Sequence, residues 1–291
     1  MPHSSGLRAF VSPLFLLVGA FLLFPLGAQA QQRPLVTEDP ETIGAGRLLI
    51  EGGFDIRRGI LFPASGLEGN LLRVPLIGLS VGVSSIAEIQ IDGGFHNRLS
   101  ITRRDPTAPF AGAVTADGDS TSDVEDFVIG TKVKLVPEGM SRPAFAVRFA
   151  TRLPNASNES GLGLDTTDFY LSFIGGKTVR SVRFVGNAGL GILGDPTRGD
   201  RQNDVLTYGV SVARAVTQAA ELVGEVNGRL DTRNGEPPPG TESRSTIRFG
   251  ARYTIGAWRA DAGILLGLAA DDANFGFTAG FTYVFNAFKV P

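Results

Sequence analysis

Residues 275–285, with the sequence FGFTAGFTYVF, alternate between two kinds of side chain. Phe, Ala and Tyr occupy the odd positions, whereas Gly, Thr and Val occupy the even ones. Successive side chains of a β-strand point to opposite faces of the sheet. The stretch therefore predicts a strand with one aromatic face in contact with an apolar medium and a second face that borders a small, mostly polar space.

The period of two continues through the rest of the chain. Residues 258–268 and 247–253 repeat the pattern just before this stretch. The same template predicts further strands at residues 48–56, 71–83, 87–101, 127–135, 143–152, 168–174, 182–192, 206–214 and 221–230. The total is about twelve, an even number, and a typical length of about ten residues suits a tilted bilayer crossing better than the ~5–6 residues of an average soluble strand.

The connections between these strands alternate in length. Short turns are expected at residues 84–85, 137–141, 175–181, 215–219 and 256–257, and longer polar links at 59–69, 102–126, 153–167, 194–204, 231–242 and 269–274. Outer-membrane barrels have tight turns on the periplasmic side and loops on the other. We therefore predict an all-β fold, a transmembrane up-and-down antiparallel β-barrel of about 12 strands over residues 46–288. A soluble lipocalin-like barrel or sandwich is the alternative, but it offers no reason for the alternation.

The side chains on the expected outer face are almost free of charge. They are mainly aromatic and aliphatic, and they include Phe54, Ile91, Phe149 and Phe173. Arg or Lys on a lipid-facing position would cost roughly 2–4 kcal/mol near the middle of the membrane. Outer-membrane lipid is therefore an expected partner. Pro75 interrupts one strand because proline lacks a backbone donor, so we expect a bulge or an early bend there.

The composition excludes several other classes of protein. With 38 Gly among 291 residues the chain is too rich in glycine for a helical bundle, and a mean hydropathy of +0.10 is too low for a polytopic helical membrane protein. A net charge of −2 argues against nucleic acid as a partner. No Cys and only two His leave little for zinc or iron–sulfur chemistry, so no cofactor and no metal is expected.

The first thirty residues have the pattern of an export signal. Arg8 precedes an apolar stretch at residues 10–26, and the tripeptide AQA at residues 28–30 provides a small-x-small cleavage site. We predict a signal peptide at residues 1–30, a periplasmic N-terminal segment at residues 31–45, and localisation in the outer membrane of a Gram-negative bacterium. An uncleaved membrane anchor is the alternative, although prolines interrupt the apolar stretch.

Charged side chains fall on the alternate positions between the outward-facing ones, and those positions are expected to face the interior of the barrel. The candidate lumen-lining residues are Glu51, Asp55, Glu88, Asp92, His96, Arg98, Lys132, Arg148, Arg152, Arg183, Glu225, Arg229, Arg248, Arg252, Arg259 and Asp261. One interpretation is a hydrated network of ion pairs that supports the wall, because buried charges need partners or water. The other is that the same groups line a selective path for solutes. A narrow pore fits a barrel of this size, since about eight strands leave a filled interior and about sixteen an aqueous channel.

No motif identifies an enzyme, and no catalytic residue is expected. His96 is the only histidine after the leader, with Ser100 on the same face of its strand. The parity directs His96 inward, whereas a membrane-embedded phospholipase needs its Ser–His pair at the lipid-facing surface. The acidic stretch at residues 117–126 fails the EF-hand pattern because Ser122 replaces the turn glycine, which leaves a solvated loop and a cation site as alternatives.

Several stretches together resemble the MetA-pathway of phenol degradation family. They are PLVTEDP at residues 34–40, GAGR at 44–47, NLLRVPL at 70–76, DFVIGTK at 126–132 and DDANFGFTAG at 271–280. The resemblance spans most of the chain after the leader and implies an outer-membrane barrel that passes hydrophobic or aromatic molecules. It supplies no catalytic residue. Many such barrels end on an aromatic residue that the insertion machinery reads, whereas six residues follow Phe285 in this sequence.

The function expected from the barrel and from the resemblance is passive uptake of small, hydrophobic or aromatic compounds through an outer-membrane channel or transporter. Small-molecule solutes and the barrel insertion machinery are then partners besides lipid. One alternative is a structural or adhesion-type barrel with a plugged lumen. Another is a membrane-embedded hydrolase.

Overall fold

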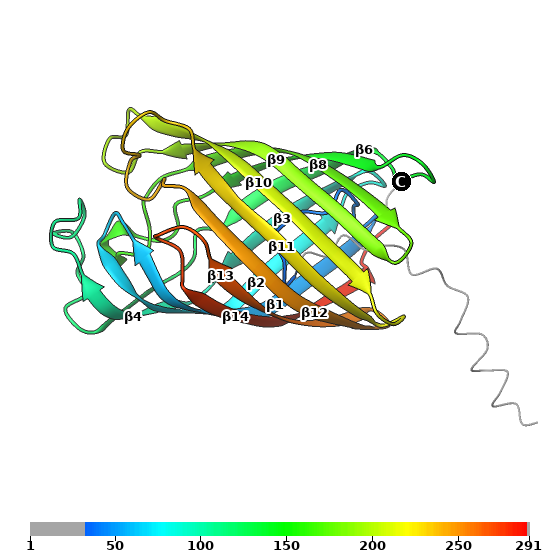
Figure 1. Ribbon diagram of the computed structural model, residues 1–291, viewed down its shortest axis with the longest axis horizontal. Helices are drawn as coiled ribbons and strands as arrows, with labels where there is room; N and C mark the ends of the chain where they lie inside the picture. The colour runs from blue at the N-terminus through cyan, green and yellow to red at the C-terminus, as the bar shows by residue number, and fades with distance from the viewer. Residues whose placement is uncertain (1–32, 290–291) are drawn as a thin grey trace, which may run out of the picture.

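The computed structural model describes residues 33–289, and its strands form one closed antiparallel sheet (Figure 1). The strands are β1 (Arg47–Phe62), β2 (Leu67–Gly82), β3 (Ala87–Gly94), β4 (Asn97–Arg104), β5 (Ser120–Asp123), β6 (Val128–Val136), β7 (Ala144–Arg152), β8 (Asp168–Val179), β9 (Val182–Gly194), β10 (Gln202–Ala215), β11 (Ala220–Asp231), β12 (Arg244–Ile255), β13 (Trp258–Gly267) and β14 (Phe275–Asn286). The sheet closes because β1 pairs with β14 as well as with β2. A single helical turn, η2 (Asn158–Ser160), lies in a loop. Within the described residues, no helix is both long and apolar enough to cross a membrane.

Two of the barrel strands are interrupted. β3 and β4 both pair with β2, while β5 pairs with β4 and β6 pairs with β3. β3 and β4 together therefore form one strand of the wall, and β5 and β6 together form the next. The described chain closes as a barrel of 12 strands, which confirms the predicted fold class and the strand number.

The interruptions lie beside Pro75, where we expected a bulge. The register between β1 and β2 shifts between Gly53 and Asp55, opposite Val74 and Pro75. In the bend between β3 and β4, the Phe95 amide donates a hydrogen bond to the Pro75 carbonyl at 3.2 Å. A bulge places proline where the ladder requires no amide donor, so the predicted irregularity is confirmed.

The bend between β3 and β4 reverses the faces of the strand that it interrupts. Gln90 is buried on an even position of β3, whereas Leu99 is buried on an odd position of β4. His96 and Arg98 are exposed, and Arg98 lies on the face opposite Leu99. The prediction that His96 and Arg98 line the lumen was therefore wrong. It assumed that the same alternation of inward and outward side chains continues through the whole of residues 87–101.

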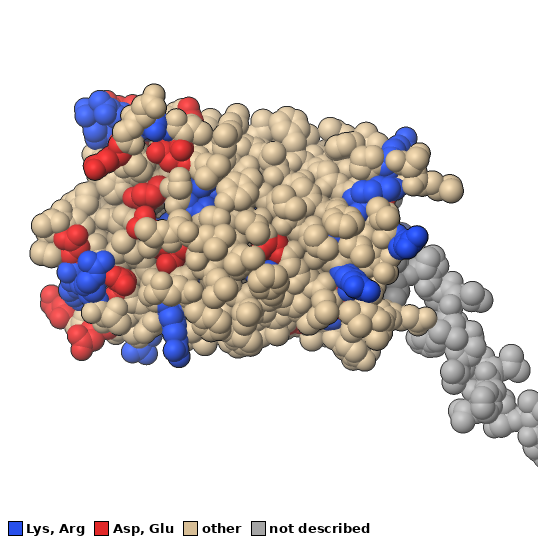
Figure 2. Space-filling model, in the orientation of Figure 1, with Lys and Arg blue, Asp and Glu red and all other residues tan. Residues whose placement is uncertain are grey.

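An apolar band surrounds the barrel. The exposed side chains on its strands are largely aromatic and aliphatic, and Phe173 and Val210 keep 61% and 60% of their surface accessible. Figure 2 shows that charged side chains gather mainly at the two ends of the barrel. At one end Trp258 stacks on Tyr283 with the ring centroids 4.3 Å apart. An apolar band flanked by aromatic rings is typical of a barrel surface that faces lipid.

The two ends of the barrel differ in their connections. The short-turn end carries the tight turns at residues 83–86, 137–143, 180–181, 216–219 and 256–257, and the long-loop end carries the other links between strands. β8 continues to Val179, so the expected turn at residues 175–181 shrinks to two residues. β1 and β2 likewise extend into the expected link at residues 59–69, and residues 63–66 alone connect them. Backbone pairing thus continues beyond the end of the alternating apolar pattern.

An apolar cluster lies inside the wall at the long-loop end. Leu67, Leu71 and Leu99 are buried at its centre. The partly buried side chains that pack against them are Ile60, Phe62, Ile101, Val114 and Leu162. The last two belong to the links at residues 105–119 and 153–167, so these links cover the inner face of β1, β2 and β4. We call these eight residues the apolar lobe.

Candidate functional site

Residues 33–46, which we call the strap, cross the interior of the barrel before β1 begins. At the start of the strap, the Arg33 guanidinium donates to the Thr278 hydroxyl of β14 at 3.1 Å and lies 3.5 Å from the Asp261 carboxylate of β13. The Val36 amide then donates to the Glu225 carboxylate of β11 at 2.9 Å. We expected residues 31–45 to be a periplasmic segment, but the described part of that segment lies within the barrel instead.

The second half of the strap runs along the opposite wall. Glu38 lies 3.2 Å from Lys132 of β6 and 3.1 Å from Arg148 of β7. Asp39 pairs with Arg183 of β9. The next acidic residue, Glu41, pairs with Lys134 at 2.9 Å, and the Ile43 amide donates to the Glu88 carboxylate at 2.7 Å. Each acidic side chain of the strap thus meets a basic side chain of the wall, as buried charges require.

Glycines of the wall make room for the strap. A Cβ atom added to Gly209 of β10 would lie 2.8 Å from the Thr37 hydroxyl, and one added to Gly176 of β8 would lie 2.7 Å from a Pro40 ring carbon. Gly250 of β12 faces Pro34 at 2.7 Å in the same way. The inward glycines therefore allow the close approach of a second segment of chain.

Two adjoining cavities lie inside the barrel on the long-loop side of the strap. The first has a volume of about 480 Å³ and the second of about 430 Å³. Both are lined by Val36, Glu38, Arg57, Arg148 and Tyr170, so the strap contributes to the wall of each. Side chains near the long-loop ends of the strands line the remainder.

Charges in the wall of the first cavity are closely paired. Asp55 lies 2.9 Å from Arg57 and 3.4 Å from Arg73, and Arg73 also pairs with Glu125. Glu51 accepts a hydrogen bond from the Thr282 hydroxyl at 3.0 Å. Five arginines and six carboxylates line this cavity, so its charge is nearly balanced: Arg33, Arg57, Arg73, Arg148 and Arg248 against Glu38, Glu51, Asp55, Asp92, Glu125 and Asp126.

The second cavity has more arginines than carboxylates. Its charged lining residues are Arg57, Arg148, Arg229 and Arg244, against Glu38 and Asp272. Arg229 donates to the backbone carbonyls of Glu242 and Gly240 at 2.8 and 2.7 Å. Within the described chain, no carboxylate pairs with Arg229. This wall can therefore accept a negative charge.

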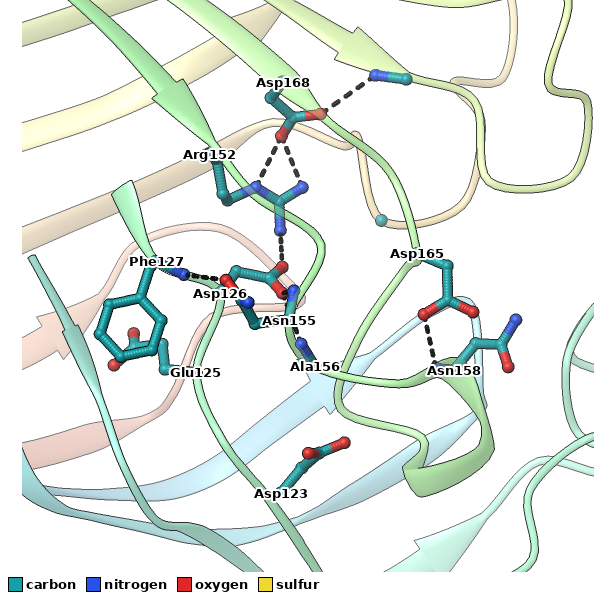
Figure 3. Close-up of polar contacts among 12 residues, drawn as sticks. Asp123, Glu125, Asp126, Phe127, Arg152, Asn155, Ala156, Asn158, Asp165 and Asp168 are labelled. Atoms are coloured by element: carbon teal, nitrogen blue, oxygen red, sulfur yellow. Dashed lines mark hydrogen bonds and ion pairs between the residues drawn. The ribbon is translucent and has the colours of Figure 1, made fainter. Parts of the chain in front are cut away.

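Acidic side chains hold the loops in place at the long-loop end (Figure 3). Arg152 lies between Asp168, at 2.8 Å, and Asp126, at 2.6 Å. The other Asp126 oxygen accepts hydrogen bonds from the amides of Asn155 and Ala156 at 2.9 and 2.8 Å. Through these contacts, the carboxylates of Asp126 and Asp168 hold residues 153–167 in place.

The acidic stretch at residues 117–126 was open to two interpretations, a solvated loop and a cation site. Asp123 accepts hydrogen bonds from the amides of Val124 and Ser157, at 2.7 and 2.8 Å. Across residues 33–289, no group of three or more acidic or histidine side chains is placed to hold a metal ion. The carboxylates of Asp123 and Asp126 therefore organise neighbouring loops.

The other predicted lumen-lining residues divide into three groups. Glu88, Lys132, Arg183, Glu225, Arg252 and Asp261 contact the strap. Glu51, Asp55, Asp92, Arg148, Arg229 and Arg248 line the cavities. Arg152 anchors the loops, and Arg259 lies 3.9 Å from Glu221 near the short-turn end.

Sequence reasoning missed the partners that the strap supplies. Glu38, Asp39 and Glu41 complete ion pairs with wall residues that are 93 or more positions away in the sequence. The sequence did contain a signal for these ion pairs. Three acidic residues lie within four positions of the strap, and the predicted inward residues include more Lys and Arg than Asp and Glu. Arg244 also lines a cavity and was absent from the candidates.

The chain was compared with protein families, curated proteins and solved structures. Residues 36–285 match the model of a family described as "Putative MetA-pathway of phenol degradation". A comparison with curated proteins found no match. Among solved structures, the chain is similar to the translocator domain of the autotransporter NalP from Neisseria meningitidis, at 14% identity and a TM-score of 0.44, with 83% of this chain and 89% of that chain covered.

Two further structures have the same kind of likeness. The TodX deltaS2S3 mutant monoaromatic hydrocarbon channel is 12% identical with a TM-score of 0.41, covering 85% of this chain and 93% of that one. LpxR from Salmonella typhimurium is 10% identical with a TM-score of 0.42, covering 82% and 100%. Because the family model matches far more than half of the sequence, the chain belongs to the MetA-pathway of phenol degradation family.

Proposed function

We propose that the protein is a passive outer-membrane channel for small hydrophobic or aromatic compounds. The observation that carries this proposal is the pair of adjoining cavities inside the closed wall, about 480 and 430 Å³ in volume. Their walls combine apolar side chains such as Val36 with charged ones such as Arg57, and their volumes lie within the ~300–1,000 Å³ of small-molecule sites. Membership of a family named for phenol degradation favours aromatic solutes.

Export and insertion belong to the same proposal. The signal peptide at residues 1–30 lies outside the described residues and stays a prediction. Phe285 belongs to the last strand and stacks on Tyr283 with ring centroids 5.3 Å apart. We propose that the barrel insertion machinery reads this strand despite the residues that follow it, and that the barrel resides in a Gram-negative outer membrane.

The strap favours a second candidate function. It crosses the lumen between the cavities and the short-turn end, and its ion pairs with Lys132, Arg148 and Arg183 hold it against several strands. A barrel closed in this way could serve a structural or adhesion role through its loops. Transport then requires that the strap moves or that solutes pass beside it.

Conductance of the purified full chain in a planar bilayer separates these two functions. A channel gives ion conductance, and cells that carry the protein take up a labelled monoaromatic solute faster than cells that lack it. Deletion of residues 31–43 tests the strap as a plug. A sealed parent that conducts after the deletion supports the plugged barrel, whereas equal conductance of the two proteins rejects a plug. No flux from either protein contradicts the channel.

We also propose that the protein is not an enzyme. His96 and Ser100 are both exposed, so the inward parity that first argued against a catalytic pair does not hold. Within the described chain, however, no hydrogen bond joins the two side chains, and a Ser–His pair requires one. Lipid hydrolysis by the purified protein that disappears in His96→Ala would overturn this proposal. Absence of hydrolysis in the parent supports it.

A further inference from the structure

We propose that the second cavity is a binding site for a small aromatic carboxylate. This inference rests on the proposed channel function and specifies the solute: an apolar body with one negative charge. The lining of the site includes the charged side chains of Arg57, Arg148, Arg229 and Arg244 and the apolar side chains of Ile60 and Leu265.

The charge of the lining is the first part of the argument. Arg148 pairs with Glu38 at 3.1 Å, and Arg244 lies 3.6 Å from Asp272. Arg57 pairs with Asp55, but Asp55 lines the first cavity and not the second. Four arginines and two carboxylates line the second cavity, and because Asp55 neutralises Arg57 from the adjoining wall, the remaining positive excess is the charge of Arg229. A partly buried positive excess attracts an anion, because unpaired charges away from water are costly.

Arg229 is the central group of the site. Its Nε and one of its terminal nitrogens donate to the backbone carbonyls of Glu242 and Gly240. These two bonds fix the guanidinium, and no carboxylate of the described chain lies within 4 Å of it to form an ion pair. The other terminal nitrogen makes no hydrogen bond within the described chain. A guanidinium that is already oriented binds a carboxylate with less loss of side-chain freedom.

The uncharged lining indicates an organic anion. Ile60, Leu265, Val36 and Ala273 present apolar surface to the cavity, and the Tyr170 side chain adds an aromatic ring. Ser172 and Thr207 supply hydroxyl groups on the same wall. A volume of about 430 Å³ lies within the ~300–1,000 Å³ of small-molecule pockets. An aromatic ring can contact these apolar side chains while its carboxylate contacts an arginine.

The first cavity is an internal contrast. It shares Arg57 and Arg148 with the second, yet Asp55, Asp92 and Glu125 balance its arginines. The positive excess therefore belongs to the part of the interior beside Arg229 and Arg244. An aromatic anion is expected to prefer that part, whereas a neutral aromatic compound has no electrostatic reason to choose between the two.

Binding to the purified full chain in detergent micelles tests the site. Benzoate is compared with benzyl alcohol, which has the same ring and no charge, by titration calorimetry. We expect benzoate to bind about tenfold more tightly, which corresponds to about 1.4 kcal/mol, because a hydrogen bond to a charged group is stronger than one between neutral groups. Arg229→Gln keeps hydrogen-bond donors but removes the charge, so benzoate binding is expected to weaken about tenfold while benzyl alcohol binding is unchanged.

Two other variants control the experiment. Arg233→Gln removes an exposed arginine whose side chain donates to the Gln202 carbonyl at 2.6 Å, and it is expected to leave benzoate binding unchanged. If Arg229→Gln does not fold, Arg57→Gln takes its place, because Asp55 keeps Arg73 as a partner. Equal affinity for the two ligands overturns the proposal. So does an affinity for benzoate that is the same in the parent and in the folded Arg229→Gln or Arg57→Gln variant.

The outcome for the site is separable from the outcome for the channel. Charge-dependent benzoate binding by a protein that passes neither ions nor solutes supports the site and contradicts the channel. Conductance and uptake of neutral aromatic solutes, combined with no preference for benzoate, contradict the site and leave the channel standing.

Discussion

The interior of the barrel is held together differently in two regions. The strap is fastened by charge: Lys132, Arg148 and Arg183 meet its acidic side chains. The apolar lobe at the long-loop end packs aliphatic and aromatic side chains around Leu99. A buried ion pair depends on both partners, whereas apolar packing weakens locally when one side chain is shortened. We therefore expect a single charge change to loosen the strap and raise conductance, whereas a change in the lobe should lower stability and leave conductance at the parent level.

The largest effect is expected from Lys132→Met. The Lys132 side chain is fully buried between Glu38 and Glu88, at 3.2 and 3.0 Å, so its loss leaves two buried carboxylates without their shared cation. We expect the free energy of unfolding in urea to fall by about 3–5 kcal/mol and the conductance of the folded fraction to rise. Lys134→Met is the control, because its pair with Glu41 is partly exposed and should matter less. Equal losses in the two variants would show that burial of the pair is not what fastens the strap.

Leu99→Ala tests the other region. Leu99 has no accessible surface and packs against Leu67 and Leu71, so truncation is expected to cost about 2–5 kcal/mol of unfolding free energy. Conductance should stay at the parent level because the strap is untouched. Leu268→Ala, at a side chain that is 58% exposed, provides the comparison and should cost little. An increase in conductance with Leu99→Ala would break the distinction between the two regions.

Gly209→Ala should loosen the strap by a smaller amount. The added methyl group would lie 2.8 Å from the Thr37 hydroxyl and 3.3 Å from its methyl group. We expect a loss of about 1–3 kcal/mol in unfolding free energy, as for other overpacked sites, together with a modest rise in conductance. Gly186→Ala is a matched control, since no atom of the described chain other than those of residues 185–187 lies within 4 Å of the new methyl group. Identical behaviour of the two variants would mean that the strap is not in close contact with the wall at Gly209.

The smallest effect concerns pH at the short-turn end. Burial tends to raise the pKa of Glu138, but hydrogen bonds from the Thr178 amide, Arg183 and Lys177 outweigh it and hold that pKa below its ordinary value. Such a carboxylate stabilises the folded protein above its ordinary pKa, and the contribution disappears as the pH falls through the folded-state pKa. Glu138→Gln should therefore lower Tm slightly at neutral pH, and the gap to the parent should close in acid.

Arg183 connects this carboxylate to the strap, because it also pairs with Asp39. The exposed Glu236 lies in a loop and provides the control as Glu236→Gln, with no pH-dependent gap expected. A Tm gap for Glu138→Gln that widens as the pH falls would contradict the direction of the pKa shift.

The barrel itself could be predicted because its signal is local. The alternating residues 275–285 lie in β14, and Pro75 lies at the bulge that its presence predicted. Strand ends were less accurate, since pairing of β1 and β2 continues through residues whose side chains no longer alternate. The parity after residue 94 was wrong for a related reason: a bend of two residues reverses the faces of a strand without a distinctive sequence.

The interior site was only partly predictable. Alternation correctly directed Lys132, Arg148 and Glu225 towards the inside, because a period of two assigns the face of each side chain. It could not pair them with Glu38 or with the Val36 amide, since those contacts join residues 94 and 189 positions apart. Nor could it separate a balanced cavity from a positively charged one, because both share several arginines.

By itself, the amino-acid sequence determined the period of two, the number of strands in the closed wall and the apolar character of its outer surface, because each depends on neighbouring residues along one strand. Only the tertiary structure decided that residues 33–46 lie inside the barrel and that Arg229 lacks a carboxylate partner within the described chain. These features depend on which charged groups meet across the lumen. The closure of the barrel and the path of the strap determine these contacts, because they bring residues that are distant in the sequence within a few ångströms of one another.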